Sequence, residues 1–132
     1  MIKRLFDIIF SIFGLIITLP IFLIVSLFVK ITSQGPIFYN GTRIGINGRH
    51  FKIFKFSTMV KDAYKIGGPS TSADDKRLTG IGKFLRKYKL DELPQFINIL
   101  RGDMSFVGPR PEIPSEVQTY DSEVKKLILS IK

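Results

Sequence analysis

The sequence contains no cysteine and one histidine, His50, among its 132 residues. The absence of cysteine excludes disulfides and thiolate metal sites, and it leaves the redox compartment open. A single histidine cannot supply a zinc cluster, so we expect His50 to be a surface residue. The sequence also lacks internal repeats and low-complexity tracts. Its length is close to that of one ordinary domain.

Charge is absent from Ile8 to Val29, a run of 22 residues. At ~1.5 Å per residue a helix of this length measures ~33 Å, which is enough to reach across the hydrocarbon core of a bilayer. The run is too long for a typical signal peptide, and no small-residue cleavage site follows it. The sequence therefore predicts a membrane segment that is retained.

Pro20 lies near the middle of this run and cannot donate a backbone hydrogen bond. Two interpretations stay open: a spanning helix with a proline kink, or a helix–break–helix that enters and leaves by the same face. Lys3, Arg4 and Lys30 flank both ends, so the preference of basic residues for the cytoplasmic side selects no orientation. Asp7 needs a partner or water, and Arg4 is a candidate partner one helical turn away.

Acidic residues are scarce: 11 Asp and Glu stand against 20 Lys and Arg, which gives a formal net charge of +9. Residues 30–89 contain 13 basic and 3 acidic residues, whereas residues 90–132 contain 5 and 7. A basic region beside a membrane segment favours anionic lipid headgroups or phosphate substrates. Nucleic acid is the competing partner, but the sequence contains no recognised nucleic-acid-binding motif.

The part of the chain after the apolar run predicts short strands followed by helices. "PIFYNGTRIG" and "HFKIFKF" are β-prone, and the Asn47-Gly48 turn signal between them predicts a hairpin. Residues 62–77, rich in Gly, Ser and Asp, predict a mobile loop. Apolar residues at i, i+3, i+4 and i+7 from Ile81 predict an amphipathic helix.

Two further helices are predicted in the last third of the chain. The first is expected from about Asp91 to Leu100, with Gly102 as its stop. The second is expected over residues 115–131, "SEVQTYDSEVKKLILSI". Between them, "MSFVGPRPE" predicts a short extended piece and a stiff turn.

Two carboxylates stand side by side in "KLDELPQF", Asp91 and Glu92. By local rules Asp91 is a good N-cap and Glu92 suits a first helical turn. The same position would prepare a nucleophile, because a helix N-terminus and nearby Arg86, Lys87 and Lys89 are expected to lower the pKa of Asp91. An ionised Asp can bind Mg²⁺ together with substrate phosphates, or attack phosphorus to form an aspartyl phosphate. The capping and catalytic interpretations are compatible.

Arg110 stands between two prolines in "GPRPE". The prolines fix φ on both sides, so the arginine is presented from a stiff backbone. It is either part of a surface turn or a preorganised bidentate clamp for phosphate.

Residues 80–112, "GIGKFLRKYKLDELPQFINILRGDMSFVGPRPE", closely resemble the signature block of the bacterial sugar transferases. These are monotopic polyprenyl-phosphate phosphoglycosyl transferases, which start the assembly of O-antigen, capsule and exopolysaccharide. "KRLFDIIFSIFGLIITLPIFLIVSLFVKITSQGPIFY" is similar to their membrane segment, and "GRHFKIFKFSTM" to their basic strand motif. The resemblance covers nearly the whole chain.

The resemblance implies an α+β fold. An N-terminal re-entrant membrane helix, residues 1–32, would be broken at Pro20, and a small, mainly helical cytoplasmic domain, residues 33–132, would carry a short β-hairpin. Both basic flanks would then lie on the cytoplasmic face of the bacterial inner membrane. Membrane lipid is an expected partner and nucleic acid is not.

The resemblance also implies a reaction: transfer of a sugar-1-phosphate from a UDP-sugar to undecaprenyl phosphate, with Mg²⁺, through a covalent phospho-sugar. Asp91 would be the nucleophile and a metal contact, and Glu92 its helper. Arg110, Arg86 and Lys55 would lie near the substrate phosphates.

The sequence departs from the family pattern in two places. Ser57 stands where the family often has Arg or Lys. Family members also usually continue for tens of residues past the position of Lys132, with a stretch that helps to complete the nucleotide site. Two interpretations follow: an active phosphoglycosyl transferase, or a truncated, inactive membrane-bound remnant that binds polyprenyl phosphate or a partner. The sequence indicates neither the sugar nor the oligomeric state.

Overall fold

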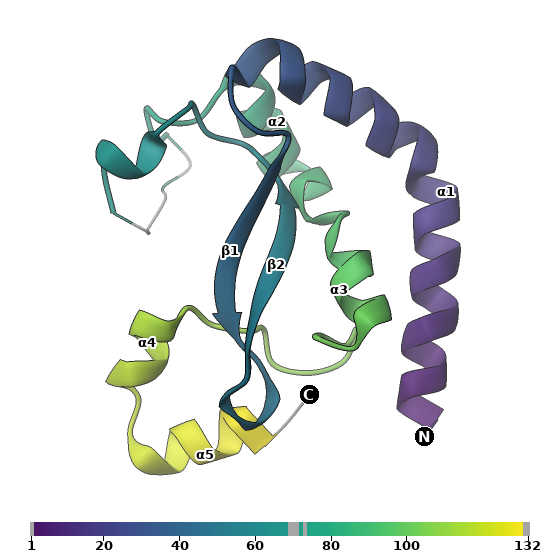
Figure 1. Ribbon diagram of the computed structural model, residues 1–132, viewed down its shortest axis with the longest axis vertical. Coiled ribbons are helices and arrows are strands. Elements are labelled where there is room, and N and C mark those ends of the chain that lie inside the picture. Colours follow the sequence, from purple (N-terminus) through teal and green to yellow (C-terminus); the bar gives the residue numbers. More distant parts are fainter. Residues whose placement is uncertain (1, 69–71, 73, 131–132) are drawn as a thin grey trace. The chain divides into compact units, whose positions relative to one another are not determined.

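The computed structural model describes residues 2–68, 72 and 74–130. A long helix, α1 (Ile2–Ser33), precedes two paired strands, β1 (Phe38–Ile44) and β2 (His50–Phe56) (Figure 1). The helices that follow are α2 (Gly80–Lys87), α3 (Gln95–Arg101), α4 (Pro114–Thr119) and α5 (Ser122–Ser130). Short 3₁₀ turns occur at Ile46–Gly48, Ala63–Lys65 and Leu90–Glu92. The predicted α+β class, with a long apolar helix at the N-terminus and one hairpin, is confirmed.

The helix α1 continues through Pro20 without interruption. Within the described part of the chain it is the one helix that is long and apolar enough to cross a membrane, judged by length and composition. Most of its large apolar side chains are exposed, from Ile2 to Ile31. A continuous helix with an internal proline is compatible with a kink, so the choice between a spanning and a re-entrant segment stays a prediction.

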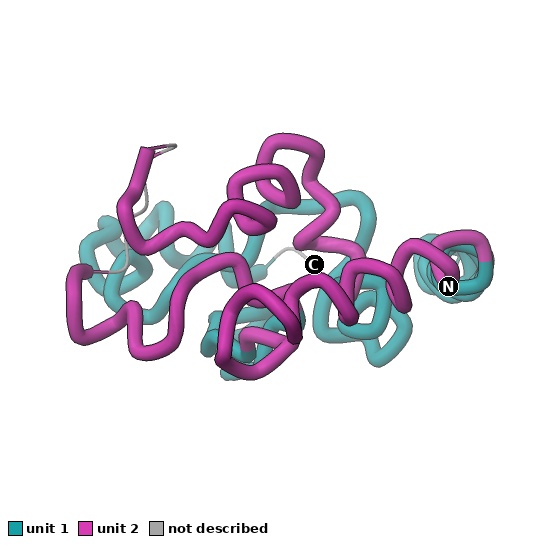
Figure 2. The backbone as a smooth tube through the Cα atoms, turned by 90° about the horizontal axis from the view of Figure 1, so that it is seen from above, with its two compact units in different colours: residues 1–16, 40–54, 95–132 teal, residues 17–39, 55–94 magenta. Residues whose placement is uncertain are grey.

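The chain forms two compact units (Figure 2). The first unit comprises residues 1–16, 40–54 and 95–132, and the second comprises residues 17–39 and 55–94. Each unit therefore contains one part of α1 and one part of the hairpin. The predicted boundary between a membrane segment, residues 1–32, and a cytoplasmic domain stays a prediction.

In the first unit, polar side chains attach the beginning of α1 to the later helices. Arg4 donates to two carbonyls in the last turn of α3, at 2.7 and 2.6 Å. Asp7, only 2% exposed, accepts hydrogen bonds from Ser105 Oγ at 3.0 Å and from Phe106 N at 3.1 Å. The partners of Asp7 are thus in the segment after α3, in place of the predicted pairing with Arg4.

Close packing supports this attachment. A Cβ atom added at Gly14 would lie 2.9 Å from the ring of Phe96, so α1 and α3 approach too closely for a larger side chain without a shift of that ring. On the other side of α3, fully buried Asn98 accepts from Phe54 N at 2.9 Å and donates to Lys52 O at 2.7 Å. Asn98 thereby satisfies two backbone groups of β2.

The second unit has an apolar core. Val25 and Val29 of α1 pack with Phe56 at the end of β2 and Leu85 of α2. Partly buried side chains surround this cluster: Phe22, Ile37, Ile81, Leu90 and Leu93. The second half of α1 is therefore part of a protein core as well as an apolar surface.

The predicted hairpin is confirmed, with its turn at Asn47-Gly48. Both residues have positive φ, +55° and +75°, which asparagine and glycine tolerate better than other residues. The amphipathic helix predicted from Ile81 is α2, and Thr79 caps it by accepting a hydrogen bond from Gly82 N at 2.9 Å. Its buried side is narrower than predicted, because Phe84 and Tyr88 are exposed.

The predicted helix from Asp91 to Leu100 is wrong at its start. Lys89 adopts a left-handed conformation with φ of 58°, the chain makes a 3₁₀ turn over Leu90–Glu92, and α3 begins only at Gln95. Asp91 is therefore not an N-cap. Gly102, with φ of 89°, does end the helix as predicted.

The predicted helix over 115–131 is two helices, because extended backbone at Tyr120 (ψ of 145°) separates α4 from α5. Its last predicted residue lies outside the described residues. The predicted mobile loop, residues 62–77, also lies partly outside them. Its described part includes an ion pair between Arg77 and Asp75 at 2.6 Å.

Candidate active site

Four of the five side chains that the sequence predicts for the reaction belong to the second unit. Lys55 comes from the end of β2, Arg86 from the last turn of α2, and Asp91 and Glu92 from the 3₁₀ turn that follows. The left-handed conformation of Lys89 changes the direction of the chain after α2, and the 3₁₀ turn that carries Asp91 and Glu92 follows it. Their catalytic roles stay predictions.

Asp91 is drawn inward by its apolar neighbours in sequence. Leu90 and Leu93 pack against the core of the second unit, and Pro94 is fully buried. As a result Asp91 is only 6% exposed, and its Oδ1 atom is buried without a hydrogen-bond partner among the described residues. A buried carboxylate oxygen without a partner is costly, and such atoms often mark functional sites.

Burial raises the pKa of the Asp91 carboxyl, and the negative charge of Glu92 raises it further. The positive charges of Lys55 and Arg86 oppose this rise without cancelling it. The predicted lowering of the Asp91 pKa is therefore wrong. Basic residues are present, but the loss of hydration outweighs their attraction.

Glu92 forms an ion pair with Lys55, with 3.0 Å between Oε1 and Nζ. The two side chains are 25% and 17% exposed. This pairing holds the Lys55 ammonium near the carboxylate pair. Glu92 therefore contributes to the site in two ways: through its own negative charge and by holding the Lys55 ammonium in place.

Arg86 Nε donates to Thr58 Oγ1 at 2.9 Å. Thr58 is almost fully buried, at 6% exposed, and lies two residues after the end of β2. The guanidinium is thus held by a hydroxyl group from a different segment. Sequence reasoning missed Thr58, although its place within the basic strand motif was a usable signal.

The arrangement can present one carboxylate oxygen of Asp91, without a partner among the described residues, within electrostatic reach of Lys55 and Arg86. Such a carboxylate, once ionised, can attack phosphorus. It also fits a hard cation: Mg²⁺ binds one or two carboxylates and completes its shell with phosphate oxygens and water. Among the described residues no group of three or more His, Asp or Glu side chains converges on one point.

The sequence profile of the bacterial sugar transferases matches residues 1–132. The chain belongs to the bacterial sugar transferase family. It is 43% identical over 135 residues to the exopolysaccharide production protein ExoY of Sinorhizobium fredii, covering 91% of this chain and 60% of ExoY. The family resemblance inferred from the dyad and its surroundings is thereby confirmed.

Two longer relatives are named for their reactions. The chain is 38% identical over 123 residues to the UDP-N-acetylgalactosamine-undecaprenyl-phosphate N-acetylgalactosaminephosphotransferase of Aeromonas hydrophila, covering 93% of this chain and 29% of the relative. It is 42% identical over 130 residues to the UDP-glucose:undecaprenyl-phosphate glucose-1-phosphate transferase of Klebsiella pneumoniae, covering 98% and 28%. The chain thus spans well under two thirds of these relatives.

The fifth predicted residue, Arg110, lies on the exposed segment before α4 in the first unit. The neighbouring Glu112 pairs its backbone with Ile44 of β1, which fixes this segment. A hydrogen bond with Glu116 raises the pKa of Glu112, as do burial and the Glu116 charge, while Arg43 and Arg110 oppose the rise. Arg110 is thus part of a charged group around Glu112, and its role as a phosphate clamp stays a prediction.

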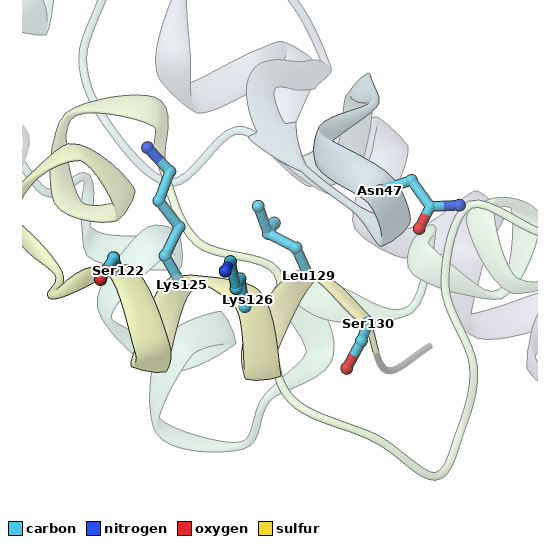
Figure 3. A pocket seen from close by; sticks show the side chains of 6 residues that line it. All are labelled: Asn47, Ser122, Lys125, Lys126, Leu129 and Ser130. Carbon is cyan, nitrogen blue, oxygen red and sulfur yellow. The ribbon is translucent and has the colours of Figure 1, made fainter.

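An open depression of about 450 Å³ also lies in the first unit, where α5 meets the hairpin turn (Figure 3). Five of its lining residues belong to α5 and the sixth is Asn47. The predicted site residues are not among the six. We therefore assign it no part in the reaction.

Proposed function

We propose that this chain transfers a sugar-1-phosphate from a UDP-sugar to undecaprenyl phosphate, with Asp91 as the covalent nucleophile. The observation that supports this most directly is the buried Asp91 Oδ1, which has no partner among the described residues and is electrostatically coupled to Lys55 and Arg86. The two longer relatives are named for the same two substrate classes with different sugars. The proposal accordingly names the class of donor and leaves the sugar open.

The chemistry has two steps. A carboxylate oxygen of Asp91 attacks the β-phosphorus of the UDP-sugar, the bond from that phosphorus to the bridging oxygen breaks, and UMP leaves. An oxygen of undecaprenyl phosphate then attacks the same phosphorus and the acyl-phosphate bond breaks. The products are the undecaprenyl-diphosphate sugar and a regenerated carboxylate.

Lys55 and Arg86 would offset the negative charge that gathers when a diphosphate approaches a carboxylate. Glu92 would keep Lys55 in place through their 3.0 Å ion pair. Mg²⁺, when held by Asp91 and the substrate phosphates, would neutralise charge on the diphosphate. Burial of Asp91 raises its pKa, as expected for a group whose reactivity is adjusted by its surroundings.

The test uses UDP-sugars labelled at the β-phosphorus, with the full chain in Mg²⁺-containing detergent and no acceptor. We expect release of UMP and label on the protein, and Asp91→Asn should abolish both. Asp121→Asn, the same change at an exposed residue, should leave both unchanged. Absence of both products from the unmodified chain, with glucose and N-acetylgalactosamine donors alike, would overturn the proposal.

We also propose that α1 is re-entrant, with both ends on the cytoplasmic face of the bacterial inner membrane. Arg4 and Asp7 near its start bind residues of the first unit, and Val25 and Val29 near its end lie in the core of the second. A spanning helix would separate one end from the polar part of the chain. Basic residues at both flanks also favour the cytoplasmic side.

Single cysteines at exposed positions near the two ends, Lys3→Cys and Thr32→Cys, test this topology in a chain that has no cysteine of its own. A membrane-impermeant maleimide should label both only after the inner membrane is permeabilised. Labelling of one position in intact spheroplasts and not of the other would show a spanning helix instead.

A further inference from the structure

The contact between Arg86 and Thr58 belongs to a longer chain of hydrogen bonds within the second unit. The Thr58 carbonyl accepts from Thr79 N at 3.0 Å and from Thr79 Oγ1 at 3.4 Å. Thr79 is also the N-cap of α2, the helix that carries Arg86. The residue that holds the arginine and the helix that carries it are therefore joined at their backbones.

A tight approach fixes this junction. A Cβ atom added at Gly82, in the first turn of α2, would lie 2.0 Å from the Thr58 carbonyl oxygen. This spacing permits only glycine without a backbone shift. The Thr58 hydroxyl is thus presented to α2 from a position that the main chain determines.

The segment after Thr58 is held as well. Met59 and Leu78 form an antiparallel bridge, and Val60 N donates to Arg77 O at 2.8 Å. The Arg77 side chain is buried and donates to both Asp75 carboxylate oxygens. Thr58 is consequently the first residue of a segment, residues 58–60, that is hydrogen-bonded to residues 77–79.

The hydroxyl engages only one edge of the guanidinium. Arg86 uses Nε for Thr58, and within the described part of the chain its two Nη groups make no hydrogen bond. The Arg86 charge acts on Asp91, so the guanidinium lies within electrostatic reach of the carboxylate. Two Nη groups with a fixed orientation are suited to bind a phosphate.

We propose that Thr58 is a positioning residue, whose hydroxyl holds Arg86 Nε and thereby directs the two Nη groups toward the substrate diphosphate beside Asp91. This inference rests on the proposed function for the identity of the substrate. The hydroxyl itself takes no part in bond making or breaking. Its contribution is to limit the orientations that the long Arg86 side chain can adopt.

The first measurement is independent of activity. In the full chain, ¹⁵N-labelled at arginine and held in detergent micelles, the Arg86 Nε–H signal is identified by its loss in Arg86→Lys. Thr58→Val should speed exchange of this hydrogen with solvent roughly tenfold, as expected for loss of one hydrogen bond. Thr58→Ser, which keeps the hydroxyl, should restore slow exchange, and Thr119→Val should have no effect because the Thr119 hydroxyl bonds only within its own helix.

The second measurement uses UDP with Mg²⁺ as the probe. Thr58→Val should weaken UDP binding roughly tenfold, and Thr58→Ser should return it to within about twofold of the unmodified chain. Unchanged Nε–H exchange or unchanged UDP affinity in Thr58→Val would overturn the inference. A chain that binds UDP in this pattern but releases no UMP would instead refute the proposed function and leave the positioning role of Thr58 standing.

Discussion

At the scale of single residues, Asp91 carries a conflict between stability and reactivity. Its carboxyl is 6% exposed, and one oxygen lacks a partner among the described residues. Burial raises its pKa, which means that ionisation is less favourable in the folded chain than in the unfolded one. The charge that the reaction needs therefore opposes folding.

Asp91→Asn should therefore stabilise the chain while it abolishes UMP release. Because the folded-state pKa is raised, the unmodified chain loses stability as pH rises from about 4 through that pKa, and the asparagine variant does not. At pH values above the folded-state pKa of Asp91, in detergent with EDTA, we expect the thermal midpoint of the variant to be roughly 2 to 5 °C higher than that of the unmodified chain. Below about pH 4 the two thermal midpoints should converge.

Glu92→Gln is the matched control, since it removes a neighbouring charge that is paired with Lys55. Glu92→Gln should not raise the thermal midpoint as Asp91→Asn does, because the change also removes the ion pair between Glu92 and Lys55. Adding Mg²⁺ should raise the midpoint of the unmodified chain and not that of Asp91→Asn. A lower midpoint for Asp91→Asn at neutral pH would contradict the account of a buried, costly carboxylate.

At the scale of elements, the pair of segments from Thr58 to Val60 and from Arg77 to Thr79 braces the start of α2. Its outer end depends on the Asp75–Arg77 ion pair, whose side chains are 13% and 8% exposed. Hydrogen bonds from Arg77 lower the pKa of Asp75 to about 2. The pair thus contributes stability above about pH 4, and this contribution is lost as pH falls through about 2.

Asp75→Asn should remove this pH-dependent contribution. At pH 7 the variant should be less stable than the unmodified chain, and the difference should shrink between about pH 4 and pH 2. Thermal unfolding over this range and a carboxyl ¹³C titration of Asp75 measure it. Asp74→Asn, at an exposed neighbour, should behave like the unmodified chain. Equal effects at both positions would show that the Asp75–Arg77 ion pair does not form in solution.

Local patterns predicted the elements whose causes are local. The turn at Asn47-Gly48 and the helix stop at Gly102 follow from positive φ, and α2 follows from helical periodicity. The start of α3 was missed because Lys89 adopts a left-handed conformation and a 3₁₀ turn over Leu90–Glu92 precedes the helix, which periodicity does not reveal. The pKa of Asp91 was missed because the sequence shows nearby charges but not burial.

At the scale of the whole molecule, α1 has two roles, one toward the protein and one toward lipid. Its buried and half-buried positions recur at helical spacing within each unit. In the first unit they are Arg4, Asp7, Ser11 and Gly14, most of them polar, and in the second they include the apolar Phe22, Val25 and Val29. Most other large side chains of α1 are exposed and apolar. In each unit α1 thus has a protein-bound side, and its remaining apolar surface is suited to lipid.

Val29→Ser and Leu27→Ser separate these roles. Val29 is fully buried with Phe56 and Leu85, so its replacement should lower the stability of the second unit by about 2 to 3 kcal/mol through lost apolar burial and a buried hydroxyl. Leu27 is 61% exposed, so the same kind of change should alter that stability by less than about 0.5 kcal/mol. Hydrogen exchange of the Phe56 and Leu85 amides in micelles measures both effects. Both variants should remain in the membrane fraction, because the other exposed apolar side chains of α1 are kept. Equal protection losses in the two variants would mean that α1 only anchors the chain and does not complete its core.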